Sequence, residues 1–278
     1  LTVSEDKNIV ISSESGVRSV YNDTVSQGAN LTPRMMFFVV EGDASASKLG
    51  KRSGTVPVVS QRGKLDKAPW KELPDLTGVL PSKFIFDVHL GSTTAPFRLL
   101  DPWRAVLPVA GDKLMTESEI DAGNDRLRAW WNEAAELWEE NRTKQSKLSL
   151  LENLNYQQKM IRQLGATKHR VVYSASGVTV AAARLEDPRI IVEHALYLMP
   201  AGGLGEARYL TAILNAPATT ELVSVYQSRG LFGARHFDKN VWRLPIPKYD
   251  PHNDLHVSLV TLAEQAELPW RDGYALTV

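Results

Sequence analysis

Short apolar runs of β-prone residues dominate the first third of the chain. The run at 34–42, "RMMFFVVEG", ends in glycine, and a second run at 83–91, "KFIFDVHLG", alternates along its length. In the second run Phe84, Phe86 and Val88 share one face, which is the period-two pattern of a half-buried strand. A polar loop that contains prolines precedes it. We therefore predict mixed β structure up to about residue 112.

The apolar spacing changes to a helical period in the middle of the chain. From Leu127 to Trp138 apolar residues recur three and four positions apart, and a second such stripe runs from Leu148 to Leu164. Gly165 then follows, a residue type that often ends helices. A capping-box pattern, "TESE", lies upstream at 116–119. The pattern predicts two long helices that form either a hairpin or one long bent helix.

The last part of the chain combines both patterns. "RVVYSA" and "VTVAAAR" flank a Ser-Gly turn and predict a β-hairpin, and "RIIVEHALYLMP" predicts a further strand. Helices are expected at 204–217, from Thr219 or Thr220 onward, and at 255–267 with Asn253 or Asp254 as the cap. The two prolines in "VWRLPIP" predict an extended segment before that last helix.

Together these elements predict an α+β fold with mixed β-sheet regions, a central long helical hairpin and a C-terminal helix. Three parts are expected: a β-rich part at 1–112, a helical segment at 113–165, and an α+β part at 166–278. A chain of 278 residues with 43% hydrophobic and 23% charged residues is long and apolar enough to bury a sizeable core.

Composition also excludes several classes of protein. No apolar run approaches the ~20 residues of a membrane helix, and the N-terminal residues lack the pattern of a signal peptide. The chain has no cysteine, which excludes disulfides, thiolate catalysis and cysteine-ligated zinc. We expect a cytoplasmic protein with no membrane partner. Because the first residue is Leu rather than Met, we also expect a piece of a longer protein.

Motifs that carry catalytic chemistry are missing or incomplete. "PAGGLGE" at 200–206 lacks the full GxGxxG spacing, and no GK[ST] or GxSxG sequence occurs. His252 and His256 are four residues apart, but the HExxH pattern of zinc enzymes is absent. The chain gives no positive evidence for catalysis or for a metal site.

Motifs in the last third resemble a known family. "ARYLTAILNAPATTELV" and "SRGLFGARHFDKNVWRLPIPKYDPHNDLHVSLVTLAEQAE" are similar to the C-terminal region of adenine-specific DNA methyltransferases from restriction-modification and phage-defence systems. "GANLTPRMMFFV" at 28–39 resembles a segment that opens the same region. The resemblance runs from about residue 28 to residue 267 and is less distinct in the Trp-rich helices.

This resemblance implies a division of labour with an upstream domain. The family's [DNS]PP[YFW] loop and its FxGxG-like loop for S-adenosylmethionine are both absent, and "LDPW" at 100–103 has one proline where two are needed. The resemblance therefore implies a target-recognition region that is not itself an enzyme and holds no cofactor. S-adenosylmethionine is expected in the upstream methyltransferase domain of the same chain, and double-stranded DNA is the expected partner.

Candidate DNA-binding residues are cations on predicted loops, because cations hold phosphates. The chain has 32 basic and 32 acidic residues, so any such role depends on local clusters. The candidates are Lys51, Arg52, Arg62, Lys64, Lys144, Lys147, Arg170, Arg229, Arg235, His236 and Lys239, with Lys48, Lys67, Lys168 and His169 as neighbours in the same clusters. Gln61, Arg62, Gln227 and Arg229 are candidates for reading bases.

Two functions remain open at this point. One is a DNA target-recognition region, and the other is a protein-interaction or scaffolding module of the same defence system with little DNA contact. Zero net charge favours the second, while the clustered cations and the resemblance favour the first. An unrelated enzyme is not excluded, but no cluster of residues supports it. Phe232 and Phe237 likewise either contact bases or anchor their loop.

Overall fold

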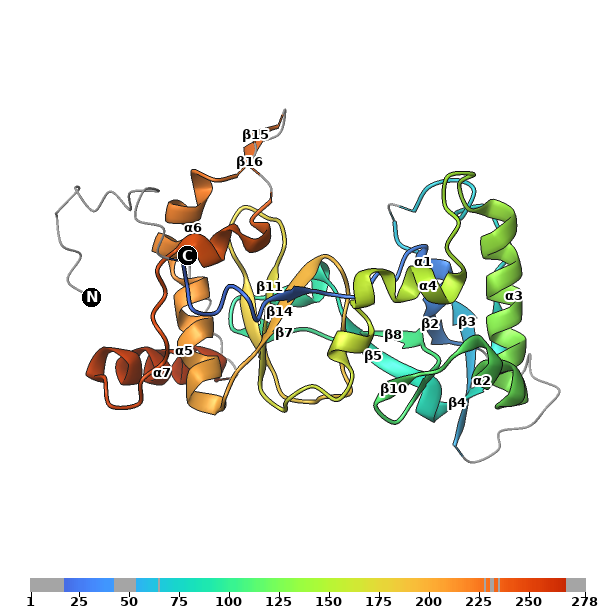
Figure 1. Cartoon of the computed structure of the whole chain (residues 1–278), viewed down its shortest axis with the longest axis horizontal. Coiled ribbons are helices and arrows are strands. Elements are labelled where there is room, and N and C mark those ends of the chain that lie inside the picture. Colours follow the sequence, from blue (N-terminus) through green and yellow to red (C-terminus); the bar gives the residue numbers. More distant parts are fainter. Residues whose placement is uncertain are drawn as a thin grey trace, which may run out of the picture.

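The chain folds into two lobes that lie side by side along its long axis (Figure 1). The computed structural model describes residues 18–42, 54–64, 66–227, 229–230, 233–234 and 236–268. Helices and several sheets occur together, which confirms the predicted α+β class. No helix in these ranges has both the length and the apolar character needed to span a bilayer.

The N-lobe is built on a six-stranded sheet. Neighbouring strands are antiparallel except for β13, which runs parallel to β5. In spatial order the strands are β13 (Ile191–Val192), β5 (Ile85–His89), β8 (Trp103–Val106), β2 (Phe38–Glu41), β3 (Thr55–Ser60) and β4 (Thr77–Pro81). Phe84, Phe86 and Val88 are all buried, as the alternating pattern predicted.

Helices of the central segment cover this sheet and share its core. Trp130 and Trp131 of α3 are buried in the same hydrophobic cluster as Phe37 and Leu80. The central helices are α2 (Glu117–Ala122), α3 (Asp125–Asn141) and α4 (Leu150–Leu154), and the short helix α1 (Arg34–Phe37) precedes β2. The predicted capping box is confirmed, because Thr116 Oγ1 accepts from Glu119 N while the Glu119 carboxylate accepts from Thr116 N.

The predicted second long helix is wrong. Only α4 is helical, and the 3₁₀ turns η5 (Tyr156–Gln158) and η6 (Ile161–Gln163) follow it. Gln157 and Gln158 have φ angles of 56° and 62°, which are left-handed and cannot continue a right-handed helix. The β structure predicted for the run at 34–42 also needs a correction, because Arg34–Phe37 form the short helix α1 before β2 begins.

The C-lobe combines a four-stranded antiparallel sheet with three helices. Its strands, in spatial order, are β1 (Ser26–Gln27), β14 (Leu196–Pro200), β11 (Arg170–Ser174) and β12 (Ala182–Leu185). The pairing of β11 with β12 confirms the predicted hairpin. The helices are α5 (Leu204–Asn215), α6 (Pro217–Ser224) and α7 (Asp254–Glu267), and α7 packs along α5. Asn253 caps α7, as predicted.

Shorter elements connect these layers. They are β6 (Thr94–Ala95), β7 (Arg98–Leu99), β9 (Val109–Ala110), β10 (Lys113–Leu114), β15 (Arg229–Gly230), β16 (Gly233–Ala234), η3 (Ser82–Phe84), η4 (Gly91–Thr93) and η7 (Asp238–Arg243). Of the predicted extended segment "VWRLPIP", the first three residues belong to η7. The extended part begins at Leu244, the residue before Pro245, because proline disfavours helical geometry in its predecessor.

The segment around Gly28 joins the two lobes. Gly28 N donates to Leu196 O of the C-lobe sheet at 2.9 Å, and Ala29 N donates to Val192 O of the N-lobe sheet at 2.8 Å. Gln163 is fully buried at the same place, where its amide exchanges hydrogen bonds with both peptide groups of Val192. One short stretch of chain therefore holds both sheets through main-chain hydrogen bonds.

Candidate nucleic-acid interface

Four exposed lysines lie on two neighbouring loops of the N-lobe. Lys64 and Lys67 belong to the β3–β4 loop, while Lys144 and Lys147 belong to the connection from α3 to α4. The loops lie together because Trp70 of the first stacks on Trp138 at the end of α3, with ring centroids 5.6 Å apart. No ion pair among the described residues neutralises these lysines, which we call the N-lobe basic set.

Arg62 holds the β3–β4 loop together from within. Its Nε donates to Trp70 O at 3.1 Å, and its two other nitrogens bind Leu73 O and the Asp75 carboxylate. A base or phosphate would have to compete with these contacts for the guanidinium. The structure therefore gives Arg62 a structural role in presenting Lys64 and Lys67, and its role in DNA contact stays a prediction.

The C-lobe carries its exposed cations beside the β15–β16 hairpin. His236 and Lys239 are both exposed, and we call them the C-lobe basic set. For Arg229 the structure describes the main chain, which lies in β15. Lys48, Lys51, Arg52 and Arg235 lie outside the described residues. The Gln227 side chain is buried, with its Nε2 unpaired among the described residues.

Two buried aromatic residues hold the segment that carries the C-lobe basic set. Phe237 and Trp242 are fully buried on either side of Lys239, so Phe237 anchors the loop and does not reach a base. Phe237 N donates to Ala175 O at 2.9 Å, and Trp242 Nε1 donates to the Tyr173 hydroxyl at 2.9 Å. Phe237 and Trp242 therefore hold the segment that carries the cations against β11 and the residue that follows it.

The tip of the β11–β12 hairpin lies next to this set, and sequence reasoning missed it. Ser176 pairs with His236 in an isolated β-bridge, and Val178 at the tip is 91% exposed. Gly177 and Thr179 are exposed as well, whereas Val180 is buried and holds the loop. The sequence indicated only a turn here, because a contact between positions 176 and 236 leaves no local signal.

Arg170 is a correction to the predicted basic clusters. It is 1% exposed on β11, and its Nη2 donates to Asp187 O and Ile190 O at 2.6 and 3.0 Å. Burial lowers the pKa of its guanidinium to about 10. A side chain this buried does not reach a phosphate on the surface, so Arg170 serves the interior of the C-lobe. Lys168, two residues earlier, is exposed.

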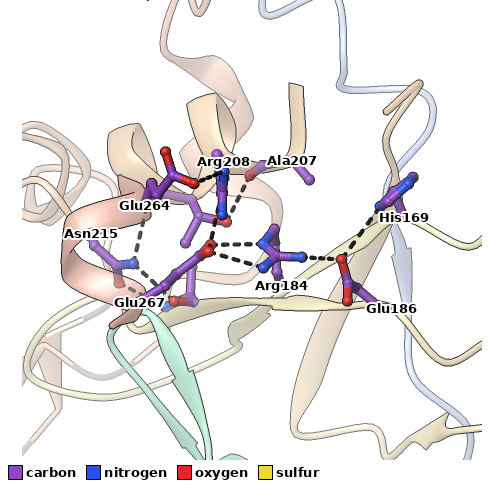
Figure 2. Close-up of polar contacts among 10 residues, drawn as sticks. His169, Arg184, Glu186, Ala207, Arg208, Asn215, Glu264 and Glu267 are labelled. Atoms are coloured by element: carbon purple, nitrogen blue, oxygen red, sulfur yellow. Dashed lines mark hydrogen bonds and ion pairs between the residues drawn. The ribbon is translucent and has the colours of Figure 1, made fainter. Parts of the chain in front are cut away.

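A network of ion pairs ties α5, α7 and β12 together (Figure 2). Glu267 of α7 receives two hydrogen bonds from Arg184 of β12, at 2.7 and 2.9 Å, and a third from Arg208 of α5 at 3.1 Å. Arg184 also donates to Glu186, which lowers the pKa of that carboxyl. His169 lies 4.0 Å from Glu186 at the edge of the network. The role of His169 in DNA binding stays a prediction. A phosphate at His169 would lie close to the negative charge of Glu186.

The glycine-rich turn before α5 is filled by the protein's own carboxylate. Glu206 accepts from Gly202 N at 2.5 Å and from the Tyr21 hydroxyl at 2.7 Å. An anion at this helix N-terminus would meet the negative charge of Glu206. Within the ranges the structure describes, there is also no group of three or more residues suited to a metal ion.

Both basic sets lie along the same long side of the molecule. Figure 1 shows the β15–β16 hairpin at the upper edge of one lobe, and the β3–β4 loop and the α3–α4 connection at the upper edge of the other. The β11–β12 tip rises toward the same edge. The segments that carry the two basic sets therefore lie at one edge of the molecule, and an extended ligand with many phosphates requires cations along such an edge.

Comparison with known proteins finds similarity among solved structures, at low sequence identity. No protein-family model and no curated protein matches the chain. Among solved structures, the type IIG restriction endonuclease BpuSI is similar with 13% sequence identity and a TM-score of 0.42. The alignment covers 84% of this chain and 26% of BpuSI, so the chain spans about a quarter of that enzyme. A TM-score of this size does not establish a shared fold, and neither the fold nor the activity of BpuSI is transferred to this chain.

Proposed function

We propose that this chain is a DNA target-recognition region that does not itself catalyse a reaction. It holds duplex DNA along the long side shared by its two lobes, for a catalytic domain upstream in the same protein. The observation that carries the proposal is the presence of one exposed basic set in each lobe on that side. The resemblance of the C-terminal motifs to DNA methyltransferases supports the same assignment.

The upstream domain, in this proposal, is an S-adenosylmethionine-dependent DNA adenine methyltransferase of a restriction-modification or phage-defence system. A base-modifying enzyme extrudes its target base, so a second surface has to grip the flanking duplex. Phosphate contacts from the two basic sets supply that grip, and side chains at loop tips such as the 176–179 turn supply base contacts.

A protein-interaction module is the second candidate function, and one feature favours it. Leu255 and Leu262, one heptad apart on α7, are 59% and 52% exposed. Exposed leucines at this spacing form a stripe that a partner helix or domain can cover. In this candidate, α7 rather than the basic edge carries the function.

Salt-dependent binding to a DNA duplex tests the proposal. Lys144→Gln with Lys147→Gln removes charge from the N-lobe, and His236→Gln with Lys239→Gln removes it from the C-lobe. We expect each double variant to weaken binding and to reduce the slope of log K against log salt by about 1 for each phosphate that is no longer neutralised. Because both sets act on one duplex, the quadruple variant should show the sum of the two effects.

Two exposed lysines on the opposite long side provide the control. Lys83 and Lys113 lie in η3 and β10, near the lower edge of Figure 1. Lys83→Gln with Lys113→Gln removes the same two charges as Lys144→Gln with Lys147→Gln but should leave the salt slope as it is. Equal losses in the control and the basic-set variants would mean that binding follows net charge alone. Salt-independent binding, or none, would reject the proposal and favour the interaction module.

A further inference from the structure

A cavity of about 370 Å³ lies beside the N-lobe basic set. It opens between the β3–β4 loop, the segment before α1, the end of α3 and the last turn of α4. Its volume falls within the ~300–1,000 Å³ of small-ligand sites. The lining residues include Trp70 and Trp138, Asn30 and Asn153, and Lys67.

One wall of the cavity is aromatic. The rings of Trp70 and Trp138 are nearly parallel, at 17°, and Trp138 is held in place by a hydrogen bond from its Nε1 to Leu148 O at 2.8 Å. Trp138 is buried, whereas Trp70 is partly exposed on the loop that also carries Lys67. A flat wall of this kind binds planar ligands by stacking, as in sites for unpaired bases.

The lining also carries two amides with unused hydrogen-bonding capacity. Asn30 Nδ2 donates to Asn153 Oδ1 at 3.0 Å, and Asn153 Nδ2 donates to Thr32 O at 2.7 Å. Asn30 Oδ1 also accepts from the Thr32 hydroxyl at 2.5 Å. Since an amide nitrogen has two hydrogens and an amide oxygen accepts two bonds, each amide keeps one donor and one acceptor position free among the described residues. A donor beside an acceptor is what the edge of a nucleobase pairs with.

A positive charge at the rim of the cavity, on Lys67, adds a contact for a phosphate group. Lys67 lines the cavity and is exposed, with no ion pair to any described residue. Asp66, also in the lining, is turned to the loop itself, where it accepts from Gly63 N at 2.8 Å. A ligand that stacks on Trp70 can therefore place a phosphate at Lys67.

We infer that this cavity binds a single unstacked nucleobase of DNA. The base stacks on the Trp70 side of the tryptophan pair, its edge meets the Asn30–Asn153 amides, and its phosphate meets Lys67. This inference rests on the proposed function, because the strand has to be brought to the cavity by the adjacent N-lobe basic set. It adds a site that selects distorted or opened DNA over a perfectly paired duplex.

A duplex with one bulged 2-aminopurine tests the inference, because stacking quenches the fluorescence of this base. We expect the protein to quench the bulged probe and to bind it more tightly than the paired duplex. Trp70→Ala should abolish the quench and weaken binding to the bulged probe about tenfold more than it weakens binding to the paired duplex. Trp70→Phe keeps a stacking surface and should retain most of the quench, provided that both variants melt cooperatively.

A second probe, 2-aminopurine riboside 5′-monophosphate, separates DNA from free nucleotides. Quenching of the bulged DNA but not of the mononucleotide supports the inference as stated. Quenching of the mononucleotide, without salt-dependent duplex binding, would overturn both the proposed function and the DNA source of the base. Salt-dependent duplex binding with no Trp70-dependent quench of the bulged probe would overturn the inference alone.

Discussion

Two guanidinium groups from different elements converge on the carboxylate of Glu267. Arg184 comes from β12 and Arg208 from α5, and their side chains are only 18% and 16% exposed. The Glu267 side chain is 13% exposed, so its hydrogen bonds are shielded from water. The same hydrogen bonds raise the pKa of Arg184. Glu267 thus links the last helix to both α5 and the C-lobe sheet.

Glu267→Gln should lower the free energy of unfolding by about 2 kcal/mol, because two partly buried cations lose their shared counter-charge. Urea denaturation measures the change. Glu264→Gln is the matched control on the same helix. Among the described residues Glu264 forms an ion pair with Arg208 alone, and its side chain is 54% exposed, so the loss should stay below about 1 kcal/mol. Equal losses for the two variants would show that the burial of Glu267 does not increase its contribution to the free energy of unfolding.

Single residues also mark the limit of what the sequence could predict. Clusters of cations identified the loops that carry Lys64, Lys67 and Lys239, because charge in a loop is usually solvated. Arg170 looked the same in sequence, but its place in a central strand of the C-lobe sheet buries it. The amides of Asn30 and Asn153 could not be paired at all, since contacts between distant residues leave no trace in a single sequence.

At the scale of elements, local signals decided which predictions succeeded. The cap residues Thr116 and Asn253 start their helices as predicted, because side-chain capping is a local interaction. The apolar stripe at 148–164 looked helical but folds as α4 and two 3₁₀ turns. Leu154 is buried and Leu151 and Leu164 pack against the core, but Ile161 is 40% exposed. The stripe therefore indicated burial only in part, and it indicated the secondary structure wrongly.

Substitutions of Asn253 test how much its capping hydrogen bonds stabilise α7. Its Oδ1 accepts from Leu255 N at 3.0 Å and from His256 N at 3.3 Å, which satisfies two of the free amides of α7. Asn253→Ala should cost about 1 kcal/mol of stability in urea denaturation. Asn253→Asp keeps an acceptor and adds a favourable charge at the helix N-terminus, so it should be neutral or slightly stabilising. A loss in both variants would assign the effect to something other than capping.

At the scale of the whole molecule, residues 27–29 connect the two lobes through main-chain hydrogen bonds. Gln27 belongs to the C-lobe sheet, and Ala29 pairs with Glu193 at the end of the N-lobe strand β13. The proposed DNA edge uses loops from both lobes, so its geometry depends on this junction. The segment "GANLTPRMMFFV", which carries part of the family resemblance, begins with Gly28. The structure explains this glycine, because the main chain at 192–193 lies too close to leave room for a side chain.

Gly28→Ala tests that junction. A Cβ atom at Gly28 would lie 2.3 Å from Glu193 O and 2.5 Å from Val192 O, both of which are main-chain atoms that cannot rotate away. We expect a loss of about 1–3 kcal/mol in stability, and weaker duplex binding because the two basic sets no longer share one orientation. Gly203→Ser is the control, since no atom lies within 4 Å of its added Cβ and serine is a good helix cap. If Gly28→Ala unfolds and binds DNA like the unmodified protein, the lobes are not held through this contact.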